Sequence, residues 1–298
     1  MQNAERNLHH LEKIVAIAAL AAVCALSVGC AQAGAKRGER TAEKKSDEVF
    51  LRSAVALVQD AASGETLIAK NQGMVLPIAS ITKLMTAIVM LDAGLNLDQR
   101  VAISDEDYDH LKGTRSRLRP GTVLTRDELL MLALMSSENR AAASLARTYP
   151  GGMSAFVAAM NAKAEALGMR DSRFVDPTGL SSANVSTAHD LARLVAAAHE
   201  YPLIRQYSTR ESAVVMAAGR PLGYRNTNGL VRSVNWDIGL SKTGYISEAG
   251  RCLVMRVRLE SREVIVVLLD SWGKLSRVGD ANRIKKWLET HAATAPRG

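Results

Sequence analysis

A serine and a lysine that could act as a nucleophile and its base stand three residues apart, at Ser80 and Lys83. On a helix this spacing puts both side chains on one face, so the hydroxyl and the amine can share a proton. A serine at a helix N-terminus lies at the positive end of the helix dipole, which favours a developing alkoxide. A buried lysine beside another cation loses basicity until its neutral amine is populated. Lys83 could then be the general base for an attack of Ser80 on a peptide-like carbonyl.

This four-residue pattern is not specific by itself, because it arises by chance about once in a chain of this length. Ser271 and Lys274 also fit it. The segment 81–91 after Ser80 is apolar on nearly all sides, which predicts a buried helix. Ser271 instead follows a strand-like run and is trailed by a glycine, as in an ordinary surface turn. We therefore expect the chemistry at Ser80.

A second candidate pair is Ser137 and Asn139, two residues apart and directly after a predicted helix, 129–135. Residues at this spacing can point the same way from a loop. The spacing alone is weak, since it recurs at 182–184 and 233–235, where a turn or a cap would explain it. We prefer Ser137 because a rigid helix would present it.

The most specific of the three motifs is Lys242, Thr243 and Gly244, which end a strand-like run. This triplet arises by chance in roughly a few per cent of chains of this length. A glycine at a strand edge lets a peptide lie close and pair with the backbone. The lysine and the threonine could supply a cation and a hydroxyl for a terminal carboxylate.

Composition excludes some classes of protein. Aromatic residues make up 4% of the 298 residues, which disfavours a protein built on stacking with bases or sugars. The formal net charge is +8, but basic residues form only short pairs and no long stripe, so nucleic-acid binding is disfavoured. The apolar fraction of 47% is ample for a packed core.

Residues 1–33 are typical of an export signal. Basic residues precede an uninterrupted apolar run, 14–26, that is too short to span a membrane comfortably, and small residues follow. The tripeptide 31–33 fits a signal-peptidase site, so we expect a periplasmic protein that starts at residue 34. Cys30 leaves a lipoprotein signal open as the competing interpretation.

Residues 34–48 are charged and poor in large apolar side chains, which predicts a disordered linker. We expect one domain over 49–292 and a short tail over 293–298. The mature chain would keep only Cys252, so it could form no internal disulfide. That cysteine lies in an apolar segment, which predicts a buried structural thiol.

Strands are predicted at both ends of this domain and helices between them. The early runs 53–58 and 66–69 indicate a hairpin. The late runs, which imply antiparallel pairing, are 237–245, 251–259 and 263–270. Helices are predicted over 129–135 after a capping box, from Thr187 to about 198, and over 141–146, 154–167 and 281–290. In the last helix Ile284, Trp287 and Leu288 share a face that could cover a sheet. This order predicts an α+β fold, an antiparallel sheet flanked by helices with a helical lobe, about 95–230, inserted in it.

The three motifs occur in one order with long separations, and in this the chain resembles the penicillin-recognising serine enzymes. The segments 174–180 and 186–192 are similar to the low-molecular-weight DD-peptidases that trim peptidoglycan, and the match covers about 49–288. The segment 133–142 is most similar to the D-alanyl-D-alanine endopeptidases of the penicillin-binding protein 7 and 8 type. The resemblance implies a β-lactamase/transpeptidase-like fold.

Roles for individual residues follow from the resemblance. It implies that Ser80 is the nucleophile, Lys83 its base and Ser137 the relay that returns a proton to the leaving amine. Asn139 would orient Lys83 and the substrate amide. The residues that would bind the carboxylate and line the site are Lys242, Thr243, Gly244 and Tyr245. The backbone amides of Ser80 and Tyr245 would form the oxyanion hole, with no metal or organic cofactor.

The expected activity is hydrolysis of D-alanyl bonds in peptidoglycan through an acyl-enzyme on Ser80, with cross-link endopeptidase preferred and D-alanyl-D-alanine carboxypeptidase as the alternative. A class A β-lactamase is disfavoured because the Glu-x-x-Leu-Asn segment is absent. An α/β-hydrolase would need a Gly-x-Ser-x-Gly elbow, which is also absent, and His189 and His199 fit helix surfaces better than a triad. An inactive wall-binding scaffold would have no chemical reason to keep all these side chains.

The expected partners are peptidoglycan stem peptides and β-lactams that acylate Ser80, with no nucleic acid. We expect no stable membrane anchor, because few residues follow the last predicted helix. A loop over 105–119 contains Arg115, Arg117 and Arg119, which could border the leaving-group side and pair with an acidic stem peptide.

Overall fold

The structure is a computed structural model that describes residues 49–260 and 262–292. The predicted export signal (1–33), linker (34–48) and tail (293–298) lie outside these residues, and so does any modification of Cys30.

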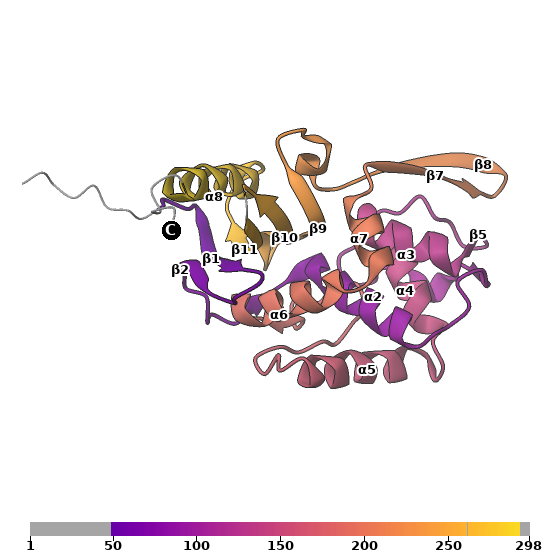
Figure 1. Cartoon of the computed structure of the whole chain (residues 1–298). Coiled ribbons are helices and arrows are strands. Elements are labelled where there is room, and N and C mark those ends of the chain that lie inside the picture. Colours follow the sequence, from indigo (N-terminus) through magenta and orange to yellow (C-terminus); the bar gives the residue numbers. More distant parts are fainter. Residues whose placement is uncertain (1–48, 261, 293–298) are drawn as a thin grey trace, which may run out of the picture. The chain divides into compact units, whose positions relative to one another are not determined.

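A five-stranded antiparallel sheet brings the two ends of the described chain together (Figure 1). Its strands are β1 (Ser53–Asp60), β2 (Thr66–Lys70), β9 (Asp237–Ile246), β10 (Gly250–Leu259) and β11 (Arg262–Ser271). The order is β2-β1-β11-β10-β9, so the first hairpin pairs with the last strand through Val55 opposite Leu269. The predicted hairpin and the three late strands are confirmed, and β9 lies at one edge of the sheet.

Each face of the sheet has its own apolar core, because alternate residues of a strand point to opposite faces. On one face α8 (Ser276–Ala292) packs against β1, β10 and β11, with Ile284 fully buried. Leu288 packs against the same core, and the ring of Trp287 stacks on that of His291. The predicted closing helix is confirmed, and it begins five residues before the predicted start.

The other face is covered by α6 (Ala188–His199), and α2 (Thr82–Asp92) packs against α6. Apolar side chains of both helices join Val55 and Val254 in the larger core. Of the 11 residues of α2, the first nine are buried, as the apolar run predicted. Further helices of the inserted lobe are α3 (Arg126–Met135), α4 (Asn139–Arg147), α5 (Gly152–Ala166) and α7 (Pro202–Thr209). The lobe lies between β2 and β9 in the chain, as expected.

Two predicted helix starts have the expected caps. Thr125 accepts a hydrogen bond from the backbone of Glu128, and the Glu128 carboxylate accepts one from the backbone of Thr125, so the capping box of α3 is complete. Thr187 accepts from the backbone of Asp190 at the start of α6. Side-chain oxygens thus satisfy amides that the helix itself leaves without partners.

The inserted lobe is not purely helical, which the sequence did not predict. It contains the short antiparallel pairs β3 (Leu76–Pro77) with β6 (Val185–Ser186) and β4 (Arg100–Ala102) with β5 (Val123–Thr125). A longer hairpin joins β7 (Ser212–Ala217) to β8 (Arg220–Arg225) and extends along the side of the lobe near β5 (Figure 1). Short 3-10 turns are η1 (Ala79–Ile81), η2 (Asp105–Asp107) and η3 (Gly229–Arg232).

Within residues 49–260 and 262–292, no helix has both the length and the apolar content needed to cross a membrane.

Candidate active site

Ser80 lies in the η1 turn, directly before α2, rather than in the first turn of the helix itself. The amine of Lys83, in the first turn of α2, donates a hydrogen bond of 2.8 Å to the Ser80 hydroxyl. Lys83 is fully buried, whereas Ser80 is half-buried and so remains reachable from outside. The predicted pairing of this hydroxyl and this amine is present in the structure.

Two glycines hold η1 against its neighbours. A Cβ on Gly179 would lie 1.9 Å from the carbonyl oxygen of Ala79, and one on Gly244 would lie 2.9 Å from that of Ile78. Neither position has room for a side chain, because backbone atoms stand in the way. Close backbone packing from two other segments therefore fixes the turn that presents Ser80.

The Lys83 amine is also held by two acceptors from distant parts of the chain. It donates to the side-chain oxygen of Asn139 at 2.7 Å and to the backbone carbonyl of Thr178 at 2.6 Å. Burial lowers the pKa of Lys83 to about 7, although the negative charges of Asp176 and Glu138 act in the opposite direction. A large share of the amine is therefore neutral near pH 7 and can accept a proton.

The segment 174–184 supplies the Thr178 carbonyl and is held by its own polar side chains. The Asp176 carboxylate accepts hydrogen bonds from the backbone amides of Thr178, Gly179 and Ser181. Asn184 lies beneath the turn, where its amide donates to the Asp176 carbonyl and to the Thr82 hydroxyl. In the sequence this segment was noted only for its resemblance to a known family. In the structure its Thr178 carbonyl contacts the Lys83 amine.

The second motif forms a wall of the site between α3 and α4. Ser137 has a φ of +60°, a left-handed conformation that is uncommon for a residue with a side chain. Its hydroxyl accepts a hydrogen bond of 2.9 Å from the amine of Lys242. Asn139, besides accepting from Lys83, donates its amide to the Thr114 hydroxyl at 3.0 Å. Ser137 and Asn139 thus connect the two lysines to this wall.

The third motif forms the opposite wall, on the edge strand β9. Lys242 is buried, and the side chain of Thr243 forms a 2.6 Å hydrogen bond with the hydroxyl of Thr227. Burial, together with the positive charges of Lys83 and Arg277, lowers the pKa of Lys242 well below its usual range. The sequence predicted that like charge would also lower the pKa of Lys83, but burial is what lowers it.

Arg277, in the first turn of α8, was not predicted as part of the site. Its guanidinium donates to the backbone carbonyls of Gly244 and Cys252, at 3.1 and 3.0 Å. Arg277 therefore connects α8 to β9 and β10 and adds positive charge close to the third motif. Tyr245, next to Gly244, is exposed, and the Arg251 guanidinium lies over its ring.

The structure thus brings together all three predicted motifs. The links are the hydrogen bonds from Lys83 to Ser80 and Asn139, the bond from Lys242 to Ser137, and the packing of Gly244 against η1. Thr114, Thr178 and Thr227 contact the site and were missed. Each contributes a backbone carbonyl or a common hydroxyl, for which no motif gives a signal.

The competing matches have structural roles instead. The Ser271 hydroxyl shares a 2.6 Å hydrogen bond with that of Ser53, which bonds to the buried carboxylate of Asp280. Burial raises the pKa of the Cys252 thiol to about 11, in keeping with the predicted structural thiol. Among the residues that the structure describes, no group of three or more His, Cys, Asp or Glu side chains could hold a metal ion.

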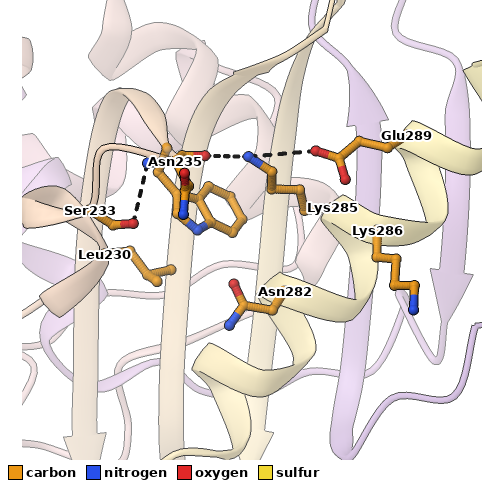
Figure 2. A pocket seen from close by; sticks show the side chains of 8 residues that line it. Leu230, Ser233, Asn235, Asn282, Lys285, Lys286 and Glu289 are labelled. Atoms are coloured by element: carbon orange, nitrogen blue, oxygen red, sulfur yellow. Dashed lines mark hydrogen bonds and ion pairs between the residues drawn. The ribbon is translucent and has the colours of Figure 1, made fainter.

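A cavity of about 700 Å³ lies away from these motifs, between η3, the start of β9 and α8. Figure 2 shows Lys285 in this cavity between the carbonyl of Asn235 and the carboxylate of Glu289, to which it is paired. The same amine lies 5.3 Å from the centre of the Trp236 ring. The amine of Lys285 is therefore already paired with groups of the same chain.

Comparisons with known proteins found relatives that match most of the chain. Residues 40–273 match the family model described as D-alanyl-D-alanine carboxypeptidase. The chain is 52% identical over 248 residues to the D-alanyl-D-alanine endopeptidase of Pseudomonas aeruginosa, which covers 82% of this chain and 80% of that protein. It is 46% identical over 261 residues to the protein of the same name from Escherichia coli, with 87% and 83% covered. Among solved structures it is similar to a D-alanyl-D-alanine carboxypeptidase of Mycobacterium tuberculosis, with a TM-score of 0.74, 28% identity, and 83% and 94% covered.

Proposed function

The chain belongs to the D-alanyl-D-alanine carboxypeptidase family of serine DD-peptidases, and we propose that it hydrolyses D-alanyl bonds of peptidoglycan through an acyl-enzyme on Ser80. The observation that carries this proposal is the 2.8 Å hydrogen bond between the Ser80 hydroxyl and a buried amine whose pKa is lowered to about 7. A nucleophile within hydrogen-bond reach of a base whose pKa lies near the working pH is what acyl transfer at neutral pH requires.

In the first step the Ser80 oxygen attacks the D-alanyl carbonyl carbon while the neutral Lys83 amine takes the hydroxyl proton. Asn139 and the Thr178 carbonyl hold that amine toward Ser80 and stabilise it once it is charged. The start of α2 lies directly behind Ser80, so the helix dipole favours the developing negative charge.

In the second step the bond from the carbonyl carbon to the leaving nitrogen breaks, and the nitrogen must gain a proton. Ser137 is the donor we assign to it. Lys242 already donates a hydrogen bond to the Ser137 oxygen, which leaves the hydroxyl hydrogen free to point to the leaving amine. The Ser137 oxygen regains a proton from Lys83, which becomes neutral again. Water then attacks the acyl carbonyl carbon while Lys83 takes one of its protons, and Lys83 gives that proton to the Ser80 oxygen as the acyl bond breaks.

Substrate would lie along the exposed edge of β9. The site for its carboxylate is formed by Lys242 and Thr243, both buried beside the hydroxyl of Thr227. Gly244 lets the peptide and η1 approach each other closely, and a Cβ there would lie 3.3 Å from the amide nitrogen of Ser80. The amides of Ser80 and Tyr245 are therefore in neighbouring segments, which supports the proposed oxyanion hole.

The cross-link between two stem peptides is the bond we propose. Two relatives, at 52% and 46% identity, are named D-alanyl-D-alanine endopeptidases, and both match more than four-fifths of this chain. The carboxypeptidase alternative rests on the description of the family as a whole. The chemistry at Ser80 is the same for both, so only the size of the leaving group differs.

The remaining proposals concern context. We propose that residues 49–292 form the peptidase domain, that the protein acts in the periplasm after cleavage of its export signal, and that β-lactams acylate Ser80. Peptidoglycan stem peptides are the expected partner.

Release of the protein without detergent would support the periplasmic location, whereas a detergent requirement with acylated Cys30 would contradict it.

Covalent labelling with a fluorescent penicillin tests the function directly. The purified protein should form a stable adduct, which a β-lactamase would hydrolyse quickly and an inactive scaffold would not form. Ser80→Ala should abolish both labelling and peptide cleavage. The matched control is Ser182→Ala, an exposed serine from a competing motif, which should label like the wild type. Labelling of the Ser80→Ala variant would contradict the assignment.

A further inference from the structure

A second cavity, of about 550 Å³, lies between the loop that follows η2 and the tip of the β7–β8 hairpin. Three of its lining residues are arginines, Arg117, Arg119 and Arg220, and its other lining residues are Ser116, Thr122, Ala217, Ala218 and Leu222. The lining contains no acidic residue. A cavity of this composition suits an anion with several oxygen acceptors.

The charge of these arginines is not neutralised within the described residues. None of the three forms an ion pair with an Asp or Glu side chain in residues 49–260 and 262–292. Arg117 nevertheless has a fixed place, because its guanidinium lies 4.0 Å from the centre of the ring of Tyr224, a buried residue of β8. One of the three cations is thus ordered by stacking and not by charge.

Both walls of this cavity begin at the candidate active site. On one side Thr114 accepts a hydrogen bond from Asn139, and the chain then continues to residues 116–122. On the other side Thr227 bonds to Thr243, and β8 leads from there back to Leu222. Leu222 and Thr227 are five positions apart in the chain, and β8 ends between them at Arg225, so the span is at most about 17 Å. Along this segment the cavity therefore lies within about 17 Å of the carboxylate site, the reach of about five extended peptide residues.

We propose that this cavity is a subsite for the carboxylates of the leaving-group peptide, the stem released when a cross-link is cut. The inference rests on the proposed endopeptidase function and adds the residues that would recognise the larger leaving group. A terminal D-alanine ends at Thr243 and does not reach the arginines, whereas an acidic stem peptide that continues past this point does. The subsite would thus distinguish a cross-link from a free terminus.

The test compares three substrates on the intact protein: a cross-linked muropeptide dimer, a monomeric pentapeptide and a fluorescent penicillin. Arg119→Ala combined with Arg220→Ala should lower kcat/KM for the dimer by about tenfold, since two partly exposed arginine–carboxylate pairs are lost. The loss should appear mainly in KM. Rates for the pentapeptide and for penicillin should stay within about twofold of the wild type, because neither reaches the cavity.

The matched control removes the same charge elsewhere. Of the three loop arginines that the sequence suggested for an acidic stem peptide, Arg117 and Arg119 line the cavity and Arg115 does not. Arg225 points to the opposite face of β8 from Arg220. Arg115→Ala combined with Arg225→Ala should leave dimer cleavage unchanged. Equal losses in both double variants, or no selective loss in the first, would overturn the subsite. Penicillin labelling of a wild-type protein that cuts no dimer would overturn the endopeptidase function and the subsite with it.

Discussion

The backbone carbonyl of Thr178 accepts a 2.6 Å hydrogen bond from the amine of Lys83, 95 positions earlier in the chain. The carbonyl is held there by the turn that Asp176 organises and by the fit of Gly179 against Ala79. The same turn therefore holds Lys83 in place and supports the backbone of η1, which presents Ser80. A change in this turn should affect both catalytic groups at once.

Gly179→Ala should remove activity without touching any catalytic side chain. Its Cβ would lie 1.9 Å from the Ala79 carbonyl oxygen, and Gly179 has a φ of +79°, so either the turn or η1 must move. A shift of about 1 Å in a catalytic group can cost about a hundredfold in rate. We expect the rate of penicillin acylation to fall by about that factor, measured as the amount of labelled protein over a time course.

Gly94→Ala is the matched control for that substitution. Gly94 also has a positive φ, +60°, but a Cβ there would meet no atom of the described residues within 4 Å, and the glycine follows the far end of α2. This variant should lose about 1 kcal/mol of stability from backbone strain and acylate normally. Normal acylation by Gly179→Ala would show that the turn does not support the site.

The architecture followed from sequence where the signals were local and strong. The apolar run of α2, the capping residues Thr125 and Thr187, and the late strand-like runs all predicted elements that the structure contains. The three motifs were also found, although the first two are weak alone, because the third is specific and all three occur in the order of a known family. Their long separation in the sequence did not prevent the prediction of one shared site, because the resemblance to a known family implied that the three motifs lie together.

The parts that could not be predicted depend on the backbone or on ordinary residues. The Thr178 carbonyl has no side-chain signature, and a threonine such as Thr227 occurs in any chain. The β7–β8 hairpin was missed because its segment was assumed to belong to a helical lobe. In β7, however, Ala213 and Val215 are buried while Val214 and Met216 are exposed, the two-residue period of a strand.

Ser137 combines a required hydroxyl with an unfavourable backbone conformation. Its φ of +60° costs about 1–2 kcal/mol for any residue with a Cβ, whereas glycine adopts it readily. We therefore expect Ser137→Gly to be about 0.5–1 kcal/mol more stable than Ser137→Ala in urea unfolding, after the greater flexibility of glycine in the unfolded chain is allowed for. Both variants should lose peptide cleavage, because both lack the proton donor.

The comparison of the two variants separates strain from chemistry. If Ser137→Ala is as stable as Ser137→Gly, the left-handed conformation carries no cost at this position. If either variant cleaves peptide at the wild-type rate, Ser137 is not the relay to the leaving amine.

Asp280 links α8 to the start of β1 and gives a prediction about stability alone. Its buried carboxylate accepts hydrogen bonds from the amides of Arg52 and Ser53, at 2.9 and 2.7 Å, and pairs with Arg283. Burial alone would raise the pKa of Asp280, but these hydrogen bonds outweigh it and the pKa is lowered. Asp280→Asn should cost about 1–3 kcal/mol of unfolding free energy at pH 7.

The pH dependence of that loss follows from the sign of the shift. A carboxylate whose pKa is lower in the folded state stabilises the fold above its unfolded pKa of about 3.9 and loses this effect as the pH falls. The gap between wild type and Asp280→Asn should therefore narrow below about pH 4. Penicillin acylation at pH 7 should be unchanged, since Asp280 does not contact the site. A gap that stays constant down to about pH 3 would contradict the lowered pKa.

The last prediction concerns the charge state of Lys83. Because its protonated form cannot accept the Ser80 proton and its pKa is about 7, acylation should rise with pH through about 7 and then level off. The carboxylate of Glu138 is nearly buried, and its negative charge raises the pKa of Lys83. Glu138→Gln removes that charge but keeps an oxygen for the amide of Arg140, which Glu138 caps at the start of α4. The acid limb of the acylation profile should then shift to lower pH, with the plateau rate little changed. Glu106→Gln, at an exposed carboxylate that has no part in the Lys83 shift, should leave the limb in place. A limb that moves to higher pH in Glu138→Gln, or moves equally in both variants, would show that the titrating group is not Lys83.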